Sequence, residues 1–204
     1  MTFAEQAAAR ATATQRARAA EEVDALVRAG LAVLARVGVE GLTVAEVLNE
    51  AGLSTRAFYR HFHSKDELLL AIYERDATAT RERLRARLVK ARSPQLAIEA
   101  WIDETLALAF DARRARHTRP LAREGARLQG EFPAEFAAIV DGVVEPLVEV
   151  LRAMGNDQPE RDARTIHAIA WQLVSEKLGG SAISAADARA HVLRFCRPAL
   201  GNRK

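Results

Sequence analysis

The segment from Thr43 to Lys65 constrains the fold of this chain more than any other part of the sequence. It reads TVAEVLNEAGLSTRAFYRHFHSK. Its first half places apolar side chains at the i, i+3, i+4, i+7 spacing of one helix face. Gly52 then stands where a helix ends most easily, because a residue without a Cβ adopts the left-handed conformation at little cost. The spacing predicts two short helices joined by a glycine turn. The apolar positions are Val44, Val47, Leu48 and Ala51.

The starts of these helices carry capping signals. Thr43 and Glu46 have the spacing of a capping box, in which the hydroxyl accepts a free backbone N–H and the glutamate reaches back to the cap. Ser64 and Glu67 repeat the pattern before the next helix. Ser54 is suited to cap the helix between them. We therefore expect a sharp corner with well-defined helix starts.

The second helix, which ends at Phe62, has one apolar side and one polar side. Phe58 and Phe62 are spaced i, i+4, which predicts that they are its buried anchors. The other side chains are expected to point outward and offer hydrogen bonds within about two turns. The DNA major groove admits one α-helix, and residues near its N-terminus can reach base edges. DNA binding is therefore the leading hypothesis. The outward residues are Ser54, Thr55, Arg56, Tyr59, Arg60 and His61.

We assign separate roles to the residues of this predicted interface. Thr55 and Arg56 are the candidates for reading bases, whereas flanking donors fix the register on phosphates. Lys65 opens the next helix, where its charge and free backbone N–H groups are placed to grip a phosphate. Arg56, Arg60 and Lys65 form a local basic cluster. The full set of DNA-binding candidates is Thr43, Ser54, Thr55, Arg56, Tyr59, Arg60, His61 and Lys65.

Upstream, a further amphipathic helix is expected to end at Gly38, and with it the segment resembles a known family. Residues 20 to 80 resemble the amino-terminal domain of the tetracycline-repressor (TetR) family of bacterial transcription regulators. The resemblance implies a sequence-specific DNA-binding regulator, a repressor by analogy, that binds a palindromic operator as a homodimer and is released by a small-molecule effector. Arg56 stands where many relatives have a small residue, so no operator preference follows. The matching elements are Gly38, Gly41, Thr43, Gly52, Phe58 to Phe62, Ser64 and Lys65.

Beyond Lys65 the period stays helical and no hairpin signal appears, so the whole chain is expected to be all-α with about nine helices. We expect three parts: a flexible arm over 1–19, a DNA-binding domain over 20–66 with its helix-turn-helix at 43–62, and a ligand-binding and dimerisation domain over 67–204. The Ala/Arg-rich composition of the arm predicts a disordered segment or a fraying helix, and its arginines are candidates for phosphate or minor-groove contacts. These are Arg10, Arg16 and Arg18.

Composition agrees with a globular regulator. The 204 residues are 49% apolar, which is enough for a packed core, but a net charge of +3 gives no broad basic surface. The single cysteine, Cys196, leaves no pair for a disulfide or a metal site. No apolar run reaches membrane-spanning length and the start lacks a secretory core, so we expect a cytoplasmic protein with no membrane contact.

Two further expectations follow from the resemblance. The last two helices carry apolar stripes, from Ile166 to Val174 and from Val192 to Cys196, which either close the monomer core or pair with a second copy. Such pairing in the family places two reading helices about 34–36 Å apart. The middle helices are where the family holds a small-molecule pocket, in which aromatic walls and a few polar groups orient a ligand. The pocket candidates are Trp101, Thr105, Phe110, Phe136, His167 and Trp171.

Two other classes of function were weighed. An enzyme or metal site would have to use His61 and His63 with Asp66 and Glu67. On one helix the two histidines point about 200° apart, so the cluster does not converge. There is no recognisable nucleophile elbow and no phosphate-binding glycine loop, so we expect no catalytic residues, no metal and no cofactor. The alternative that remains is a helical adaptor that no longer binds DNA.

Overall fold

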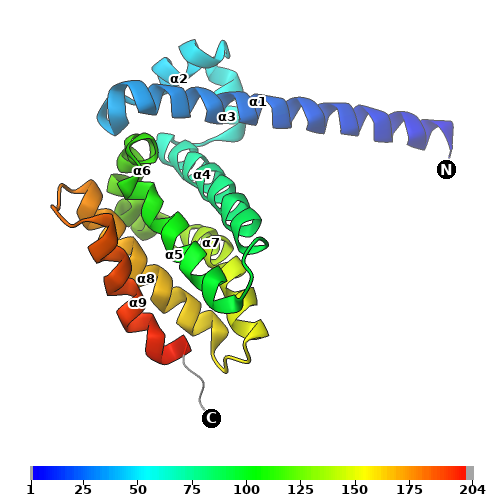
Figure 1. Ribbon diagram of the computed structural model, residues 1–204. Helices are drawn as coiled ribbons and strands as arrows, with labels where there is room; N and C mark the ends of the chain where they lie inside the picture. The colour runs from blue at the N-terminus through cyan, green and yellow to red at the C-terminus, as the bar shows by residue number, and fades with distance from the viewer. Residues whose placement is uncertain (1, 201–204) are drawn as a thin grey trace. The chain divides into compact units, whose positions relative to one another are not determined.

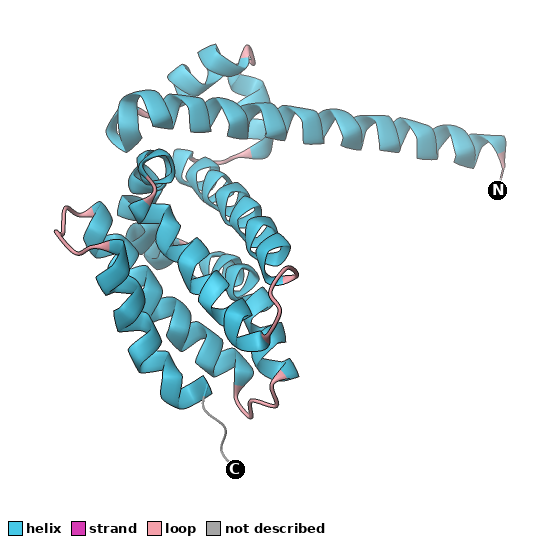
Figure 2. Cartoon of the chain, viewed as in Figure 1, coloured by secondary structure: helices cyan, strands magenta, loops and turns pink. Residues whose placement is uncertain are grey.

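The computed structural model describes residues 2–200, with side chains for all of these except 7 and 197–200. Over this range the chain is made of nine helices and no strands, which confirms the all-α prediction (Figures 1 and 2). The fold divides into two compact units, one up to Tyr73 and one from Glu74, so the division falls inside α4. The helices are α1 (Phe3–Gly41), α2 (Val44–Ala51), α3 (Thr55–His61), α4 (Lys65–Leu88), α5 (Pro94–Phe110), α6 (Ala112–Glu131), α7 (Pro133–Ala153), α8 (Pro159–Leu178) and α9 (Ala185–Leu200).

The first unit packs α2, α3 and the start of α4 against the second half of α1. Gly30 of α1 lies so close to α4 that a Cβ there would stand 2.7 Å from Cδ1 of Ile72. This contact explains why the first turns of α4 belong to the first unit, although residue 66 was the boundary expected from the sequence. The fully buried side chains of this core include Leu26, Leu42, Val47, Phe58, Leu68, Leu69 and Ile72.

The amino-terminal segment, expected to be either disordered or a fraying helix, is helical in the structure. Thr2 and Glu5 form a capping box: the Thr2 N–H donates to Oε2 of Glu5 at 2.7 Å, and the Glu5 N–H donates to Oγ1 of Thr2. From there α1 runs to Gly38, which has a φ of 73° and ends the regular helix as predicted. The described side chains up to residue 18 are exposed. Alanine has the highest helix propensity, so this composition sustains a helix without a core beneath it.

The second unit is a helical bundle built on α5, which contacts α6, α7, α8 and α9. In Figure 1, α8 and α9 run side by side, in agreement with their contacts. The core contains the fully buried Trp101 of α5, where a large aromatic side chain removes much apolar surface from water. Its other fully buried members include Leu84, Ile98, Ile102, Leu147, Ala163, Ala170, Val174, Ala188 and Val192.

Proline stands in the first turn of three helices of the second unit. Ser93 caps α5 through the Leu96 N–H at 3.3 Å, and Pro94 occupies its first turn. Pro133 and Pro159 occupy the first turns of α7 and α8, which have no side-chain cap. Pro120, in contrast, lies inside α6 and does not mark a start.

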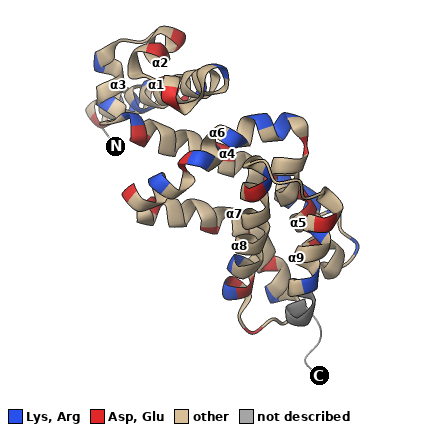
Figure 3. Cartoon of the chain, turned by 90° about the vertical axis from the view of Figure 1, so that its left-hand side faces the viewer, with Lys and Arg blue, Asp and Glu red and all other residues tan. Residues whose placement is uncertain are grey.

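Charged residues of both signs are interspersed along the helices (Figure 3), as the small net charge of +3 predicts. In the first unit, α1 carries charges of both signs, α2 carries only the acidic Glu46 and Glu50, and α3 carries the basic Arg56 and Arg60. None of the described helices combines the length and the apolarity that crossing a bilayer needs.

Candidate nucleic-acid interface

The corner between α2 and α3 has the predicted geometry. Gly52 is left-handed, with φ 64° and ψ 30°, and the Leu53 N–H donates to the carbonyl of Leu48 at 3.2 Å. This is the Schellman arrangement, in which the chain turns sharply at the end of a helix. The start of α2 is capped by Thr43, whose Oγ1 accepts the Glu46 N–H at 3.1 Å.

One half of the expected capping box at Thr43 is wrong. The Glu46 carboxylate does not reach back to the cap; its Oε2 lies 3.3 Å from the Arg36 guanidinium of α1. A charge-assisted bond to arginine outcompetes a backbone N–H for the same oxygen. Glu50 lies 3.6 Å from the same guanidinium, so this end of α1 is tied to α2 by charge.

The second helix of the corner, α3, is anchored as predicted. Ser54 caps it by accepting the Ala57 N–H at 3.2 Å. Phe58 is fully buried and Phe62 nearly so, with their ring centroids 5.8 Å apart. An isolated helix of seven residues has little stability of its own, so these two aromatic anchors and the cap hold α3 in place.

The N-terminal part of α3 presents its polar side to solvent. Ser54, Thr55 and Arg56 are exposed, and Tyr59 is 55% exposed. Arg56 has no hydrogen bond or ion pair with any described residue, so its guanidinium keeps all five donors for a partner outside the chain. The ring of Tyr59 packs edge-on against Phe58 at 5.3 Å, which leaves its hydroxyl directed away from the core.

The C-terminal part of α3 differs from the expectation, because Arg60 and His61 both contact Glu22 of α1. Nη2 of Arg60 lies 2.6 Å from Oε2 of Glu22, and Nε2 of His61 lies 2.8 Å from the same oxygen. The side chain of His61 is only 10% exposed. Its predicted outward orientation is therefore wrong, because a hydrogen bond to a nearby carboxylate draws it inward. Arg60 remains exposed.

Glu22 is a residue of this site that the sequence reasoning missed. Its side chain is 12% exposed, and Nε of Arg18 lies 3.5 Å from its other oxygen. The hydrogen bond from His61 and the nearby charge of Arg60 hold the pKa of Glu22 below its ordinary value, against the opposing effect of burial. A signal was available: Glu22 stands four residues before the fully buried Leu26, on the buried side of α1.

The start of α4 is capped much as predicted. Ser64 Oγ accepts the Glu67 N–H at 3.1 Å, and the Glu67 carboxylate accepts from the His63 N–H at 2.7 Å, one residue before the expected Ser64. Lys65 is half-buried at the first position of α4 and has no partner among the described residues. A lysine at a helix N-terminus is well placed for phosphate, because both contribute positive charge.

Four of the six pocket candidates lie in one region of the second unit. The His167 ring is 6.1 Å from that of Trp101 and stacks on Trp171 at the same distance. Burial lowers the pKa of His167 to about 4, so the ring is neutral at pH 7. Trp101 Nε1 and Thr105 Oγ1 are buried one helical turn apart on α5 without a hydrogen-bond partner.

The other two candidates lie in different surroundings. The Phe110 ring lies 5.4 Å from the ammonium of Lys177, a cation–π contact between α5 and α8. Phe136 is buried on α7 but is not part of the apolar cluster that contains Trp101. Ring contacts join Trp101, His167 and Trp171, and Thr105 lies one helical turn from Trp101, whereas Phe110 packs against the same apolar cluster without joining these ring contacts.

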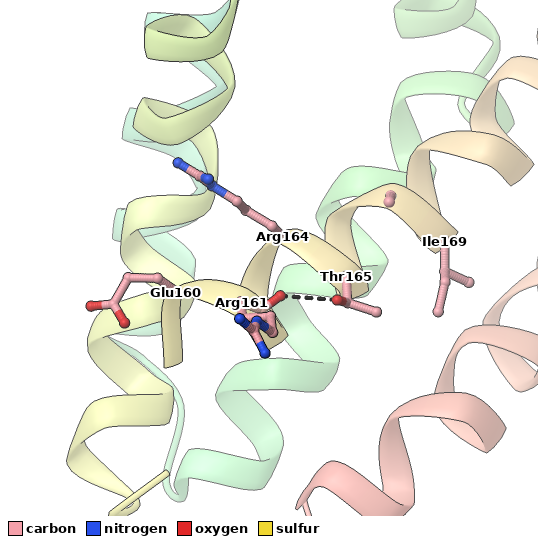
Figure 4. Close-up of a pocket in the computed structure, with 6 residues that line it drawn as sticks. Glu160, Arg161, Arg164, Thr165 and Ile169 are labelled. Carbon is pink, nitrogen blue, oxygen red and sulfur yellow. Dashed lines mark hydrogen bonds between the residues drawn. The ribbon is translucent and has the colours of Figure 1, made fainter. Parts of the chain in front are cut away.

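Two open hollows lie on the surfaces of α8 and α9, and neither is lined by a pocket candidate. The larger, of about 540 Å³, follows α8 (Figure 4). There Thr165 donates to the carbonyl of Arg161 at 2.9 Å, and Arg164 reaches Asp141 of α7 at 2.6 Å. The second hollow, of about 380 Å³, lies along α9. The α8 lining is Glu160, Arg161, Arg164, Thr165, Ala168 and Ile169; the α9 lining is Ala186, Arg189, Ala190, Leu193 and Arg194.

The apolar stripes of α8 and α9 divide between the core and the surface. Most of their members close the core of the second unit, which was one of the two alternatives. Ile169 and Leu193 are only partly buried, and Phe195 is 56% exposed. Ile169 lines the α8 hollow and Leu193 lines the α9 hollow. The buried members are Ile166, Ala170, Leu173, Val174, Val192 and Cys196.

The candidate residues for a metal or redox site, His61, His63 and Cys196, do not come together. His61 contacts Glu22, whereas His63 is exposed. Within residues 2–200, no three His, Cys, Asp or Glu side chains converge as a metal ion requires. Burial raises the pKa of Cys196 to about 11, so its thiol is protonated and unreactive at pH 7.

Comparisons with known proteins place this corner in a family. Residues 26–72 match the model of "Bacterial regulatory proteins, tetR family". The HTH-type transcriptional regulator CymR of Pseudomonas putida is 36% identical over 120 residues, which is 55% of this chain; the chain spans 59% of the length of that relative.

Solved structures share the fold along nearly the whole chain. A TetR transcriptional regulator from Rhodococcus sp. RHA1 is 20% identical, with a TM-score of 0.69 over 93% of this chain and 100% of its own. The regulator FadR of Bacillus subtilis, solved in complex with stearoyl-CoA, is 16% identical, with a TM-score of 0.61 over 87% of this chain and 97% of its own. The family match over residues 26–72 and the shared fold along the rest make the chain similar to the TetR family of bacterial transcriptional regulators.

Proposed function

We propose that this chain is a sequence-specific regulator that binds double-stranded DNA through α3. The observation that carries the proposal is the exposed N-terminal side of α3, where Arg56 has five unused donors and no partner among the described residues. A guanidinium forms two parallel hydrogen bonds to guanine in the major groove, so a free arginine at this position is suited to base readout. Thr55, exposed beside it, is the second reader.

The remaining contacts are to the phosphate backbone. Tyr59 and Lys65 flank the readers on α3 and α4, and Thr43 stands at the start of α2. Such contacts fix the register on the duplex and carry no sequence information themselves. Ser54 belongs to the same exposed edge. His61 is not included among the direct contacts, because its ring is largely buried and bonded to Glu22.

We further propose that the chain acts as a homodimer through the outer sides of α8 and α9. The support is three apolar side chains that the subunit leaves uncovered in part, Ile169 and Leu193, or in large part, Phe195, and that a second copy would cover. A twofold dimer presents two reading helices and so predicts a palindromic operator. Light scattering on a sizing column should give a dimer mass at micromolar concentration, and Phe195→Glu should shift it toward the monomer. A monomeric parent would contradict this part.

A small-molecule effector is proposed for the region of Trp101, Thr105, His167 and Trp171. Two buried polar atoms without a partner, Trp101 Nε1 and Thr105 Oγ1, are the groups that a ligand would satisfy. FadR of Bacillus subtilis, a structural neighbour, was solved with stearoyl-CoA, so the fold is able to hold a small molecule. Such a ligand would release DNA only if it bound the DNA-competent form more weakly. We propose in addition that the regulator represses transcription and works in the cytoplasm.

Selection of bound fragments from a bacterial genomic library tests the proposal most directly. The expected result is one enriched palindrome, protected in a footprint, with half-sites about one helical turn apart. Binding to random duplex should be weaker and fall steeply with salt. A chain that binds no duplex at any salt concentration would instead be a helical adaptor with the same fold.

A further inference from the structure

The contact between Glu22 and the end of α3 has a consequence for DNA binding. Glu22 faces three basic groups, Arg60, His61 and Arg18, at 2.6, 2.8 and 3.5 Å. Two of them are on the helix proposed to lie in the groove. Both of these approach the same carboxylate oxygen, Oε2, so one acidic side chain holds the end of α3.

The two α3 partners differ in their freedom to move. His61 is 10% exposed, so its ring is fixed between α3 and α1. Arg60 is 54% exposed, and its guanidinium meets the carboxylate at the edge of the contact, where water and ions can reach it. The pair is only partly shielded from water, because the guanidinium stays exposed although the carboxylate is nearly buried. A phosphate oxygen close by would therefore compete for the same guanidinium.

We propose that Glu22 is a positioning residue that withholds Arg60 from the phosphate backbone and so lowers the sequence-independent part of duplex affinity. The inference rests on the proposed function, since it concerns α3 on a duplex. Phosphate contacts carry no sequence information, so Glu22 alters affinity for operator and random duplex alike. Weaker non-specific binding leaves more of the protein free, because a genome offers on the order of a million or more competing sites.

The test replaces only the charge of Glu22. In Glu22→Gln the amide keeps nearly the same shape, and its oxygen still accepts from His61, but the attraction for Arg60 is lost. Affinity for a fluorescein-labelled duplex of random sequence is measured by anisotropy between about 50 and 200 mM salt. Each additional bond to phosphate steepens the log–log salt slope by about 0.9, so its advantage shrinks about 3.5-fold over this range. A dimer with both subunits engaged would show twice the change in slope.

Two variants serve as controls. Glu21→Gln removes the same charge one residue away, from an exposed side chain without a partner among the described residues, and should leave the slope unchanged. Glu22→Gln combined with Arg60→Gln should lose the tighter binding, because the freed guanidinium is absent. Glu22→Asp keeps the charge on a shorter side chain, so it should steepen the salt slope by less than Glu22→Gln. It takes the place of Glu22→Gln if that variant does not unfold cooperatively.

The outcomes separate the inference from the function beneath it. A steeper slope and tighter binding at low salt in Glu22→Gln alone support the inference, provided that the operator-to-random ratio is unchanged. An unchanged slope, an equal effect in Glu21→Gln, or weaker binding at all salt concentrations would overturn it and leave the DNA-binding function intact. A parent protein that binds no duplex at all would overturn both.

Discussion

Glu22 in the first unit and Glu104 in the second each hold three basic side chains, but at different depths. Glu22 is 12% exposed, and two of its partners lie on α3 beside an open surface. Glu104 is 3% exposed, and arginines from α4 and α6 surround it on α5: Arg83, Arg87 and Arg114, at 3.5, 3.1 and 2.6 Å. The similar contact therefore has different consequences. In the second unit the contacts of Glu104 join α4, α5 and α6. In the first unit the contact of Glu22 holds the solvent-exposed side chain of Arg60.

The largest expected effect is on stability, from Glu104→Gln. Loss of the charge leaves three guanidinium groups facing one another around a buried amide, and breaking a buried pair in this way typically costs about 3–5 kcal/mol. The arginines are partly exposed and can regain water, so we expect the lower end, about 3 kcal/mol, in urea unfolding followed by circular dichroism.

Glu99→Gln is the matched control. Glu99 lies on the same helix and pairs with Arg189 at 2.6 Å, but its side chain is 40% exposed. Its loss should cost less than about 1 kcal/mol. If the two variants lost the same stability, burial would not be what separates Glu104 from a surface pair.

The second prediction concerns acid and His167, a partly buried histidine of the second unit. The pKa of His167 is about 4 in the folded chain and near 6.5 when unfolded, so the unfolded state binds more protons between these values. Stability should therefore fall as pH falls from 6.5, by about 3 kcal/mol at pH 4. In His167→Gln, the unfolding free energy measured between pH 6.5 and pH 4 should no longer show this fall. A parallel decline in parent and variant would assign the acid sensitivity to other groups.

The helix corner of the first unit could be predicted from local sequence signals, whereas its long-range contacts could not. The corner could be read from Thr43, Gly52, Ser54 and Phe58, because caps, a left-handed glycine and helical spacing act within a few residues. The partner of His61 lies 39 residues upstream, and no periodicity indicates which charge meets which.

The second unit shows the same limit more strongly. Its helix starts were marked by Ser93 and by prolines, but helical spacing treats Trp101 and Thr105 as ordinary core positions and cannot show that their polar atoms lack partners. Glu104 stands in an apolar helix with nothing local to reveal three arginines from two other helices. The arm is helical, one of the two alternatives that its composition left open, because its alanines favour helix even without packing.

The third prediction returns to the exposed side of α3, where function and not stability should change. Arg56→Ala removes an unpaired, exposed guanidinium and should reduce discrimination between the selected operator and random duplex by about 1–3 kcal/mol. Unfolding free energy should stay the same. Competition binding measures the ratio, with Arg28→Ala, an exposed arginine paired to Asp24 on α1, as the control. An undiminished ratio would show that Arg56 does not read bases.

Lys65→Ala provides the complement to that experiment. A lysine that grips phosphate contributes equally on every sequence, so its loss should weaken operator and random duplex alike. The log–log salt slope should become shallower by about 0.9 for each subunit engaged. A change in the operator-to-random ratio would instead place Lys65 among the base contacts.

The smallest expected effect comes from His117 of the second unit, whose side chain is 38% exposed, between the exposure of a buried group and that of a surface group. Nε2 of His117 lies 3.2 Å from Asp76, and this hydrogen bond raises the pKa of the ring above 6.5. The pair is therefore fully stabilising below pH 6.5 and loses its contribution as pH rises through the folded pKa, opposite in sign to His167. Solvent screening limits the effect to less than about 1 kcal/mol. Unfolding at about pH 6 and pH 8 in the His167→Gln background isolates it, and Asp76→Asn should abolish the difference. A difference that survives Asp76→Asn would mean that exposure, and not this carboxylate, sets the behaviour of His117.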